Sequence, residues 1–275
     1  MAASLFNMSS SLDVLGHFQT PCTVLFTTYI FMYVFAIIVY IPILWRKRSR
    51  VSEPEDNANV LFITAHPDDE CMFFAPAILG VESHSSLLCF TTGNYDQKGD
   101  VRKKEVLKSC SVLGMSPQQV TVLDIRSLPD SPKVQWDRQQ VCSEILRHCQ
   151  QHRVKKIYTF DGYGVSGHSN HRELYKAVRH LKIDRKELQD IECYILQSVN
   201  LLRKYTSLLD LPYSVYTADV VYVSSPSQVL TAQRAMYAHW SQFVWFRILF
   251  IFFSRYLIIN TFTKIDVYKQ FNKHS

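Results

Sequence analysis

Short runs of β-branched and aromatic residues alternate with helical patterns along most of this chain, and this alternation restricts the available folds more than any other feature. Six runs are typical of strands, at residues 60–65, 87–91, 120–124, 156–160, 194–198 and 219–224. Helical patterns lie between them at 101–113, 137–152 and 171–181. Because strands that alternate with helices form βαβ units, we expect a largely parallel sheet with helices on both faces. The predicted class is α/β, a Rossmann-like three-layer sandwich.

The segment before this domain has the composition of a membrane span. Residues 23–45 contain no charged side chain, and a cluster of Arg and Lys follows at 46–50. The run is long enough to cross the hydrocarbon core of a bilayer, and the positive-inside rule then places the N-terminus in the lumen and the domain in the cytosol. A buried helix of a soluble core is the alternative interpretation. We expect a short lumenal N-terminus at 1–22, one transmembrane helix at 23–45, a basic and polar linker at 46–59 and a cytosolic domain at 60–239.

The C-terminal segment 240–275 differs from the domain before it. Residues 240–262 are crowded with Trp, Phe, Leu and Ile, but Arg247 and Arg255 interrupt them. A charge inside hydrocarbon is costly, so a second full span is not expected. Two interpretations stay open: a helix or flap that lies in the membrane interface, and a C-terminal helix that packs on the sheet.

Charge and cysteine content argue against three further possibilities. The formal net charge is +6, but the cluster at 46–50 supplies four of the 30 basic residues, so 26 basic residues face 24 acidic ones in the rest and the balance is only +2. Such a balance does not indicate nucleic-acid binding. The seven cysteines are odd in number and form no Cys-x-x-Cys pair, which disfavours a disulfide framework and a thiolate zinc site. We expect free thiols in a reducing compartment.

Two clusters of polar side chains follow two of the predicted strands. The letters HPDDE at 66–70 follow the first strand, and one imidazole with two adjacent carboxylates suits a divalent metal, although the same carboxylates could instead stabilise a helix N-terminus. A glycine-rich loop with His168 and His171 follows the strand at 156–160. By itself such a histidine pair is often solvent-exposed. Because parallel strands present their carboxyl ends at one edge, the two clusters can meet there as a two-histidine, one-carboxylate site.

These motifs, in this order, resemble the PIG-L/LmbE-type metal-dependent deacetylases. The resemblance rests on AHPDDE at 65–70 and GVSGHSNH at 164–171, and it extends through FFAP, TGNY, RKKE, QSVN, LRKY and SLLDLP, over nearly the whole predicted cytosolic part. It implies that His66, Asp69 and His171 bind Zn²⁺ or another divalent metal. It also implies that Asp68 is the general base and that His168 stabilises the oxyanion or protonates the departing amine. Asn94 and Arg102 are similar to family positions that face the substrate, and Arg203 and Lys204 are alternative contacts for a phosphate.

The resemblance and the anchor together imply a substrate and a location. The reaction would convert N-acetylglucosaminyl-phosphatidylinositol, a glycolipid, to glucosaminyl-phosphatidylinositol and acetate, the second step of glycosylphosphatidylinositol-anchor biosynthesis, at the endoplasmic reticulum membrane. A catalytically silent membrane scaffold that binds glycolipid, and a deacetylase of another N-acetylated sugar, are the alternatives. The bacterial relatives tend to have Pro-Asp where Ser169 and Asn170 stand here, so we expect this chain to lack a carboxylate beside His168.

Overall fold

The computed structural model describes residues 58–81 and 84–266, together with residues 23, 24, 26–31, 33–35 and 38. The chain divides into two compact units, 1–50 and 51–275. The described residues of the first unit are helical, with exposed apolar side chains such as Val24, Phe26 and Phe31. None of the helices among the described residues combines the length and apolarity that a bilayer crossing needs. The predicted lumenal segment 1–22, part of the predicted span and the linker up to residue 57 lie outside the described residues.

The second unit is built on one seven-stranded sheet with the order β3-β2-β1-β4-β5-β7-β6. Its strands are β1 (Asn59–Thr64), β2 (Ser85–Cys89), β3 (Val120–Val122), β4 (Val154–Phe160), β5 (Glu192–Leu196), β6 (Val220–Val223) and β7 (Ile259–Lys264). Strands β1 to β5 pair in parallel, and β7 is antiparallel to both β5 and β6. The strand order reverses between β1 and β4, and a ligand crevice is expected at their carboxyl ends.

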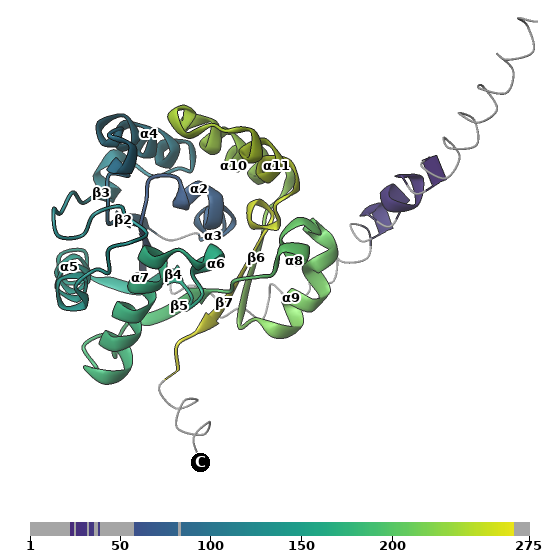
Figure 1. Ribbon diagram of the computed structural model, residues 1–275. Coiled ribbons are helices and arrows are strands. Elements are labelled where there is room, and N and C mark those ends of the chain that lie inside the picture. Colours follow the sequence, from purple (N-terminus) through teal and green to yellow (C-terminus); the bar gives the residue numbers. More distant parts are fainter. Residues whose placement is uncertain are drawn as a thin grey trace, which may run out of the picture. The chain divides into compact units, whose positions relative to one another are not determined.

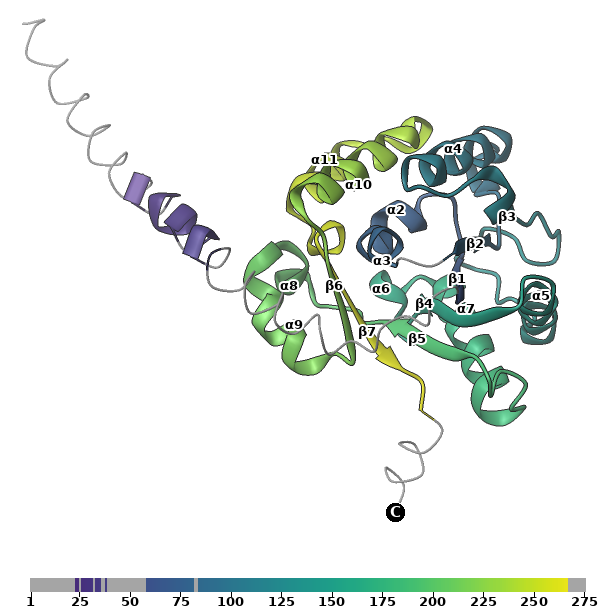
Figure 2. The same ribbon diagram turned by 180° about the vertical axis from the view of Figure 1, so that it is seen from behind.

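Helices cover both faces of the sheet, as Figures 1 and 2 show, and the α/β three-layer architecture expected from the alternation is confirmed. One face carries α2 (Asp69–Phe73), α3 (Ala75–Gly80), α4 (Gly99–Val112), α10 (Pro226–Ala238) and α11 (Trp245–Phe253). The other carries α5 (Arg138–Gln151) and α7 (Ser169–Arg179), while α6 (Gly164–Gly167) precedes α7 and the short α8 (Leu201–Tyr205) and α9 (Leu211–Thr217) follow β5. Single turns complete the connections at Asn94–Asp96, Pro117–Gln119, His180–Asp184, Ser207–Asp210, Trp240–Gln242 and Arg255–Leu257.

The central strands are buried on both faces, which explains why they contain apolar runs rather than alternating patterns. In β1, Leu61, Phe62 and Ile63 are fully buried. The ring of Phe62 stacks on Tyr158 of β4 with the centroids 5.2 Å apart. The six described cysteines are also buried and free, as the composition predicted.

The C-terminal segment belongs to this fold and is not a separate part. Strand β7 lies between β5 and β6, and Phe262 in β7 is fully buried. Arg255, which interrupts the aromatic run, is also fully buried, with its Nη1 3.2 Å from Asp210 Oδ2. Residues beyond 240 therefore pack in the same sheet domain as the residues before them, through strand β7 and the buried face of α11.

Candidate metal centre and active site

The first polar cluster occupies the turn between β1 and α2. The carboxylate Oδ2 of Asp69 accepts the backbone N–H groups of Ala65 (3.0 Å) and His66 (2.9 Å). Asp68 adopts a φ of 122°, a region that side chains other than glycine rarely enter and that is found at functional sites. Backbone N–H groups of the turn therefore hold the carboxylate of Asp69 in place.

The second cluster lies in the loop from β4 through α6 to α7. The imidazole of His171 stacks on Phe160, with the centroids 3.8 Å apart and the planes 1° from parallel. Its Nδ1 lies 3.1 Å from the carbonyl oxygen of Gly164. Because a carbonyl only accepts, Nδ1 carries the proton and Nε2 is left as the electron-pair donor. Gly164 has a φ of 70°, and a Cβ there would lie 2.8 Å from the Cβ of His171, so the loop requires glycine at this position.

The two clusters meet at the carboxyl ends of β1 and β4. His66 Nδ1 lies 3.3 Å from His171 Nε2, and His171 Nε2 lies 3.2 Å from Asp69 Oδ1. The remaining separation, His66 Nδ1 to Asp69 Oδ2, is 3.7 Å. Ligand atoms about 2.0–2.1 Å from a tetrahedral metal are about 3.4 Å from one another. The three side chains therefore fit the ligand set of a divalent metal ion.

His168 lies against the same group. Its ring centroid is 4.5 Å from that of His66 and 5.0 Å from that of His171, and nitrogen atoms of the three imidazoles all lie within 4.8 Å of one another. Burial and the neighbouring imidazoles His66 and His171 lower the pKa of His168 to about 4. Its buried Nδ1 has no hydrogen-bond partner within the part of the chain that the structure describes, so it is available to a ligand.

Burial and charge act in opposite directions on the buried His66 and Asp69. Burial disfavours protonated His66, but the hydrogen bond that His66 donates to Asp130 and the charge of Asp69 outweigh it and raise the pKa of His66. Burial likewise favours a neutral Asp69, but in the absence of a metal a protonated His171 and its hydrogen bond outweigh it and hold the pKa of Asp69 far below its ordinary value. The site thus keeps an ionised carboxylate, the form that binds a cation.

Asp130 is a site residue that the sequence motifs did not indicate. It lies in the loop between β3 and α5, and its Oδ1 is 3.2 Å from Nε2 of His66. Asn170 contacts the same ring nitrogen, with its Nδ2 at 3.1 Å. A carboxylate on the far nitrogen of a ligand imidazole fixes the ring and makes the other nitrogen a better ligand. Asn170, where the bacterial relatives tend to have Asp, therefore contacts His66, whereas we expected this difference to affect His168.

Arg247 of α11 contacts the aspartate that the motif assigns as the base. Its Nη2 donates to Oδ2 of Asp68, and both side chains are almost fully buried. Burial disfavours the charged guanidinium, but the charge of Asp68 outweighs it and raises the pKa of Arg247. The C-terminal aromatic segment thus contributes a side chain to the candidate active site.

Glu70, the last residue of the first motif, stabilises the turn between β1 and α2 by hydrogen bonds. Its Oε2 accepts the backbone N–H of Asp68 at 3.0 Å, and its Oε1 lies 2.7 Å from Nε2 of His239 and accepts the hydroxyl of Ser109. Cys71 completes a second group of potential metal ligands with Glu70 and His239. Burial raises the pKa of its thiol well above the ordinary value, and Glu70 and His239 already satisfy each other. This group is structural.

The predicted substrate contacts differ in their surroundings. Arg102 Nη1 lies 3.8 Å from Asp130 Oδ2 and Nη2 donates to Asp96 at 3.2 Å, so Arg102 reaches the edge of the site. Asn94 is exposed, and its Oδ1 accepts the N–H of Gly99 at 3.0 Å. Its side chain therefore stabilises the local turn.

The alternative phosphate contacts have partners of their own. Arg203 donates to Asp210 of the same region, and Lys204 Nζ lies 5.2 Å from the ring centroid of Phe250. Arg203 is therefore engaged in an ion pair, whereas Lys204 lies over an aromatic ring.

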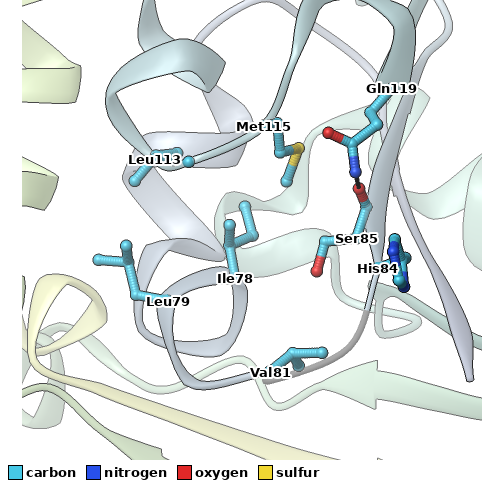
Figure 3. Close-up of a pocket in the computed structure, with 9 residues that line it drawn as sticks. Ile78, Leu79, Val81, His84, Ser85, Leu113, Met115 and Gln119 are labelled. Atoms are coloured by element: carbon cyan, nitrogen blue, oxygen red, sulfur yellow. Dashed lines mark hydrogen bonds between the residues drawn. The ribbon is translucent and has the colours of Figure 1, made fainter. Parts of the chain in front are cut away.

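A separate cavity of about 390 Å³ lies at the amino end of β2 (Figure 3). Ile78, Leu113 and Met115 supply apolar walls, and Gln119 Nε2 donates to the carbonyl oxygen of Ser85 at 2.8 Å. None of the candidate site residues lines it. It therefore takes no part in the chemistry at the carboxyl ends of the strands.

The fold and the site together define a class: a Rossmann-like α/β protein that places two histidines and one carboxylate at the reversal of its strand order. Residues 61–182 match the family described as PIG-L: GlcNAc-PI de-N-acetylase. The N-acetylglucosaminyl-phosphatidylinositol de-N-acetylase of Bos taurus is 46% identical over 227 residues, which cover 79% of this chain and 90% of the relative. A probable de-N-acetylase of the same description from Schizosaccharomyces pombe is 35% identical over 214 residues, covering 74% and 85%. The chain belongs to the GlcNAc-PI de-N-acetylase family.

Solved structures share the architecture at low sequence identity. The N,N'-diacetylchitobiose deacetylase of Pyrococcus horikoshii has a TM-score of 0.54 at 16% identity, over 77% of this chain and 85% of that one. The 4-carboxy-2-hydroxymuconate hydratase of Pseudomonas putida has a TM-score of 0.51 at 12% identity, over 76% and 96%. These likenesses concern the fold alone, and because the two proteins bear the names of different reactions, the fold does not identify the chemistry.

Proposed function

We propose that this chain is a metal-dependent hydrolase that removes the acetyl group from N-acetylglucosaminyl-phosphatidylinositol and releases acetate. The observation that carries the proposal is the convergence of His66, Asp69 and His171 at metal-ligand spacing, in a member of this family. We propose Zn²⁺ as the metal because two imidazoles and one carboxylate, with a coordination position left for water, form a typical catalytic zinc site. The product would be the second intermediate of glycosylphosphatidylinositol-anchor biosynthesis.

In this proposal the protein supplies the groups that move protons and stabilise charge. A divalent metal in the site would polarise the acetamide carbonyl and lower the pKa of the attacking water. Asp68 accepts the proton of that water and passes it to the nitrogen that leaves, so that water and amide become acetate and free amine. Arg247 and the backbone contact to Glu70 hold Asp68 in position. His168 donates a hydrogen bond to the oxyanion of the tetrahedral state.

The proposal is tested by measuring bound metal and acetate release with the purified full-length chain. We expect His171→Ala and Asp69→Ala to lose both. Asp68→Asn is the matched variant, because it should keep the metal and lose turnover by about 10²–10⁴-fold. Turnover that survives in Asp69→Ala would refute the assigned site. A wild-type chain that binds the glycolipid but releases no acetate with any divalent metal would instead indicate a silent scaffold.

For the substrate, the alternative to the glycolipid is another N-acetylated sugar. The names of the relatives favour the phosphatidylinositol glycolipid. Comparing kcat/KM for this glycolipid with that for free N-acetylglucosamine tests the choice. We expect the lipid to be strongly preferred, and equal values would favour a soluble amino sugar.

We also propose that residues 23–45 anchor the chain in the endoplasmic reticulum membrane as a single span, with the catalytic domain in the cytosol. The run without charge, the basic cluster at 46–50 and the free cysteines support this arrangement. Protease protection of microsomes tests it. We expect a tag at the C-terminus to be cleaved from outside and a tag at the N-terminus to be protected, and the reverse pattern would overturn the orientation.

A further inference from the structure

Helix α11 has one buried face and one exposed apolar face. Arg247, Phe250 and Ile251 are buried against the domain. The opposite face presents Trp245, Phe246, Leu249 and Phe252 to solvent, with Trp245 74% exposed. A helix of a water-soluble domain normally places polar side chains on its outer face, so this face indicates contact with another apolar phase.

Helix α8 also exposes apolar side chains. Lys204 of α8 lies over the ring of Phe250 of α11, with Nζ 5.2 Å from the ring centroid, so the two helices are adjacent (Figures 1 and 2). Leu201 and Leu202 of α8 are 72% and 76% exposed. We call the group formed by Leu201, Leu202, Trp245, Phe246, Leu249 and Phe252 the α8–α11 surface. Large apolar side chains exposed in this number on a folded domain mark interaction sites.

We propose that the α8–α11 surface inserts into the interfacial layer of the bilayer that holds the substrate. Trp and Phe beside Leu are the side chains that settle at a membrane–water boundary. Neither α8 nor α11 contains an Asp or a Glu. A surface without carboxylates suits an anionic layer such as one that contains phosphatidylinositol. The apolar side chains and the absence of carboxylates from both helices therefore favour a lipid surface over a second protein.

This docking would place the candidate active site at the membrane, and in that respect it rests on the proposed function. The buried face of α11 reaches the site directly, since Arg247 contacts Asp68. Phe250 also packs on Phe73 with the centroids 6.0 Å apart, and Phe73 lies 6.1 Å from the ring of His171. One helix thus has lipid on its outer side and the site on its inner side. A sugar headgroup has to travel only a short distance from the bilayer to the metal.

Spin labels on the full-length chain in phosphatidylcholine–phosphatidylinositol vesicles test the docking itself. In a Cys22→Ser background, a nitroxide is attached at Phe246→Cys, at Leu202→Cys or, as a solvent control, at Lys155→Cys in β4, where the side chain is exposed. We expect the first two labels to collide more with oxygen, which partitions into lipid, and the control to collide more with a water-soluble nickel complex. Equal water access at all three positions would overturn the proposal. Shielding from both reagents would also overturn it, because a protein segment would then cover the surface.

A kinetic comparison separates docking from catalysis. Trp245→Ser/Phe246→Ser should raise KM for glycolipid in vesicles roughly 10- to 100-fold, because two apolar side chains no longer leave water. Its turnover of a short-chain, water-soluble analogue should stay unchanged, and Trp245→Leu/Phe246→Leu should behave like wild type. Equal losses on both substrates would show a structural role and refute docking. If the wild type releases no acetate from either substrate, the proposed function fails, and the spin labels still decide the docking.

Discussion

Removing the side chain of His239 should destabilise the domain strongly, although this residue is distant in the sequence from both motifs. His239 and Glu70 are both fully buried, and their Nε2 and Oε1 atoms are 2.7 Å apart. Burial disfavours protonated His239, but the charge of Glu70 outweighs it and raises the pKa of His239. For Glu70, burial raises the pKa, but the charge of His239 outweighs it and lowers it. The two residues therefore form a buried ion pair.

The size of the effect follows from what the substitution leaves behind. In His239→Ala the Glu70 carboxylate stays buried with only the Ser109 hydroxyl and the Asp68 N–H as partners. Breaking a buried pair in this way costs about 3–5 kcal/mol. Glu70→Gln replaces the charge by a neutral amide, so His239→Ala should cost about 2 kcal/mol less when Glu70→Gln is already present.

Urea unfolding of the full-length chain in detergent, followed by circular dichroism, measures these free energies for the two single variants and the double variant. The pH dependence provides a second readout. Because the native pKa of His239 is raised, its contribution is fully present below its unfolded pKa of about 6.5 and is lost as the pH rises through the native pKa. His239→Ala should lack this loss. Strictly additive free energies together with an unchanged pH dependence would refute the ion pair.

Three further outcomes are expected. Burial lowers the pKa of His148 to about 4, so below pH 6.5 the unfolded chain binds more protons than the native chain. This residue should therefore remove roughly 2 kcal/mol of stability as the pH falls from about 6.5 toward 4. Urea unfolding of His148→Gln at these two pH values should show a smaller loss of stability than the wild type. A chelator should lower the Tm of the wild type but leave that of His171→Ala unchanged, and equal shifts would argue against the site. Asp130→Asn should weaken metal binding by about 10–100-fold in equilibrium dialysis, and Asn170→Asp in that background should recover part of it.

Local patterns were sufficient to predict the parallel part of the fold. The apolar runs around Phe62 and Tyr158 correspond to β1 and β4, because strands that are buried on both faces need apolar side chains throughout. Once these strands are parallel and adjacent, the residues that follow them must share one edge of the sheet. The approach of His66 to His171, more than 100 positions apart in the chain, follows from that topology.

Residues whose partners are distant in the sequence could not be predicted in this way. Strand β7 follows an aromatic helix and lies between β5 and β6. The six residues of β7 do not indicate which strands it pairs with. Arg247 was interpreted as a charge that interrupts an apolar run. Its contact with Asp68 spans 179 positions. Such pairs depend on how helices pack across the sheet, and hydrophobic periodicity says only which face of a helix is apolar.

Asn170 stands where the resemblance leads us to expect Asp, and it shows why a difference from a motif has to be judged from the structure. By sequence, Asn170 is a lost carboxylate next to His168. In the structure its amide lies beside Nε2 of His66, and Asp130 reaches the same nitrogen from another loop. Two carboxylates at this point would repel each other and compete for one N–H group. The β3–α5 loop therefore supplies one negative charge beside the imidazole, through Asp130, and this support of the proposed metal ligand His66 does not depend on residue 170.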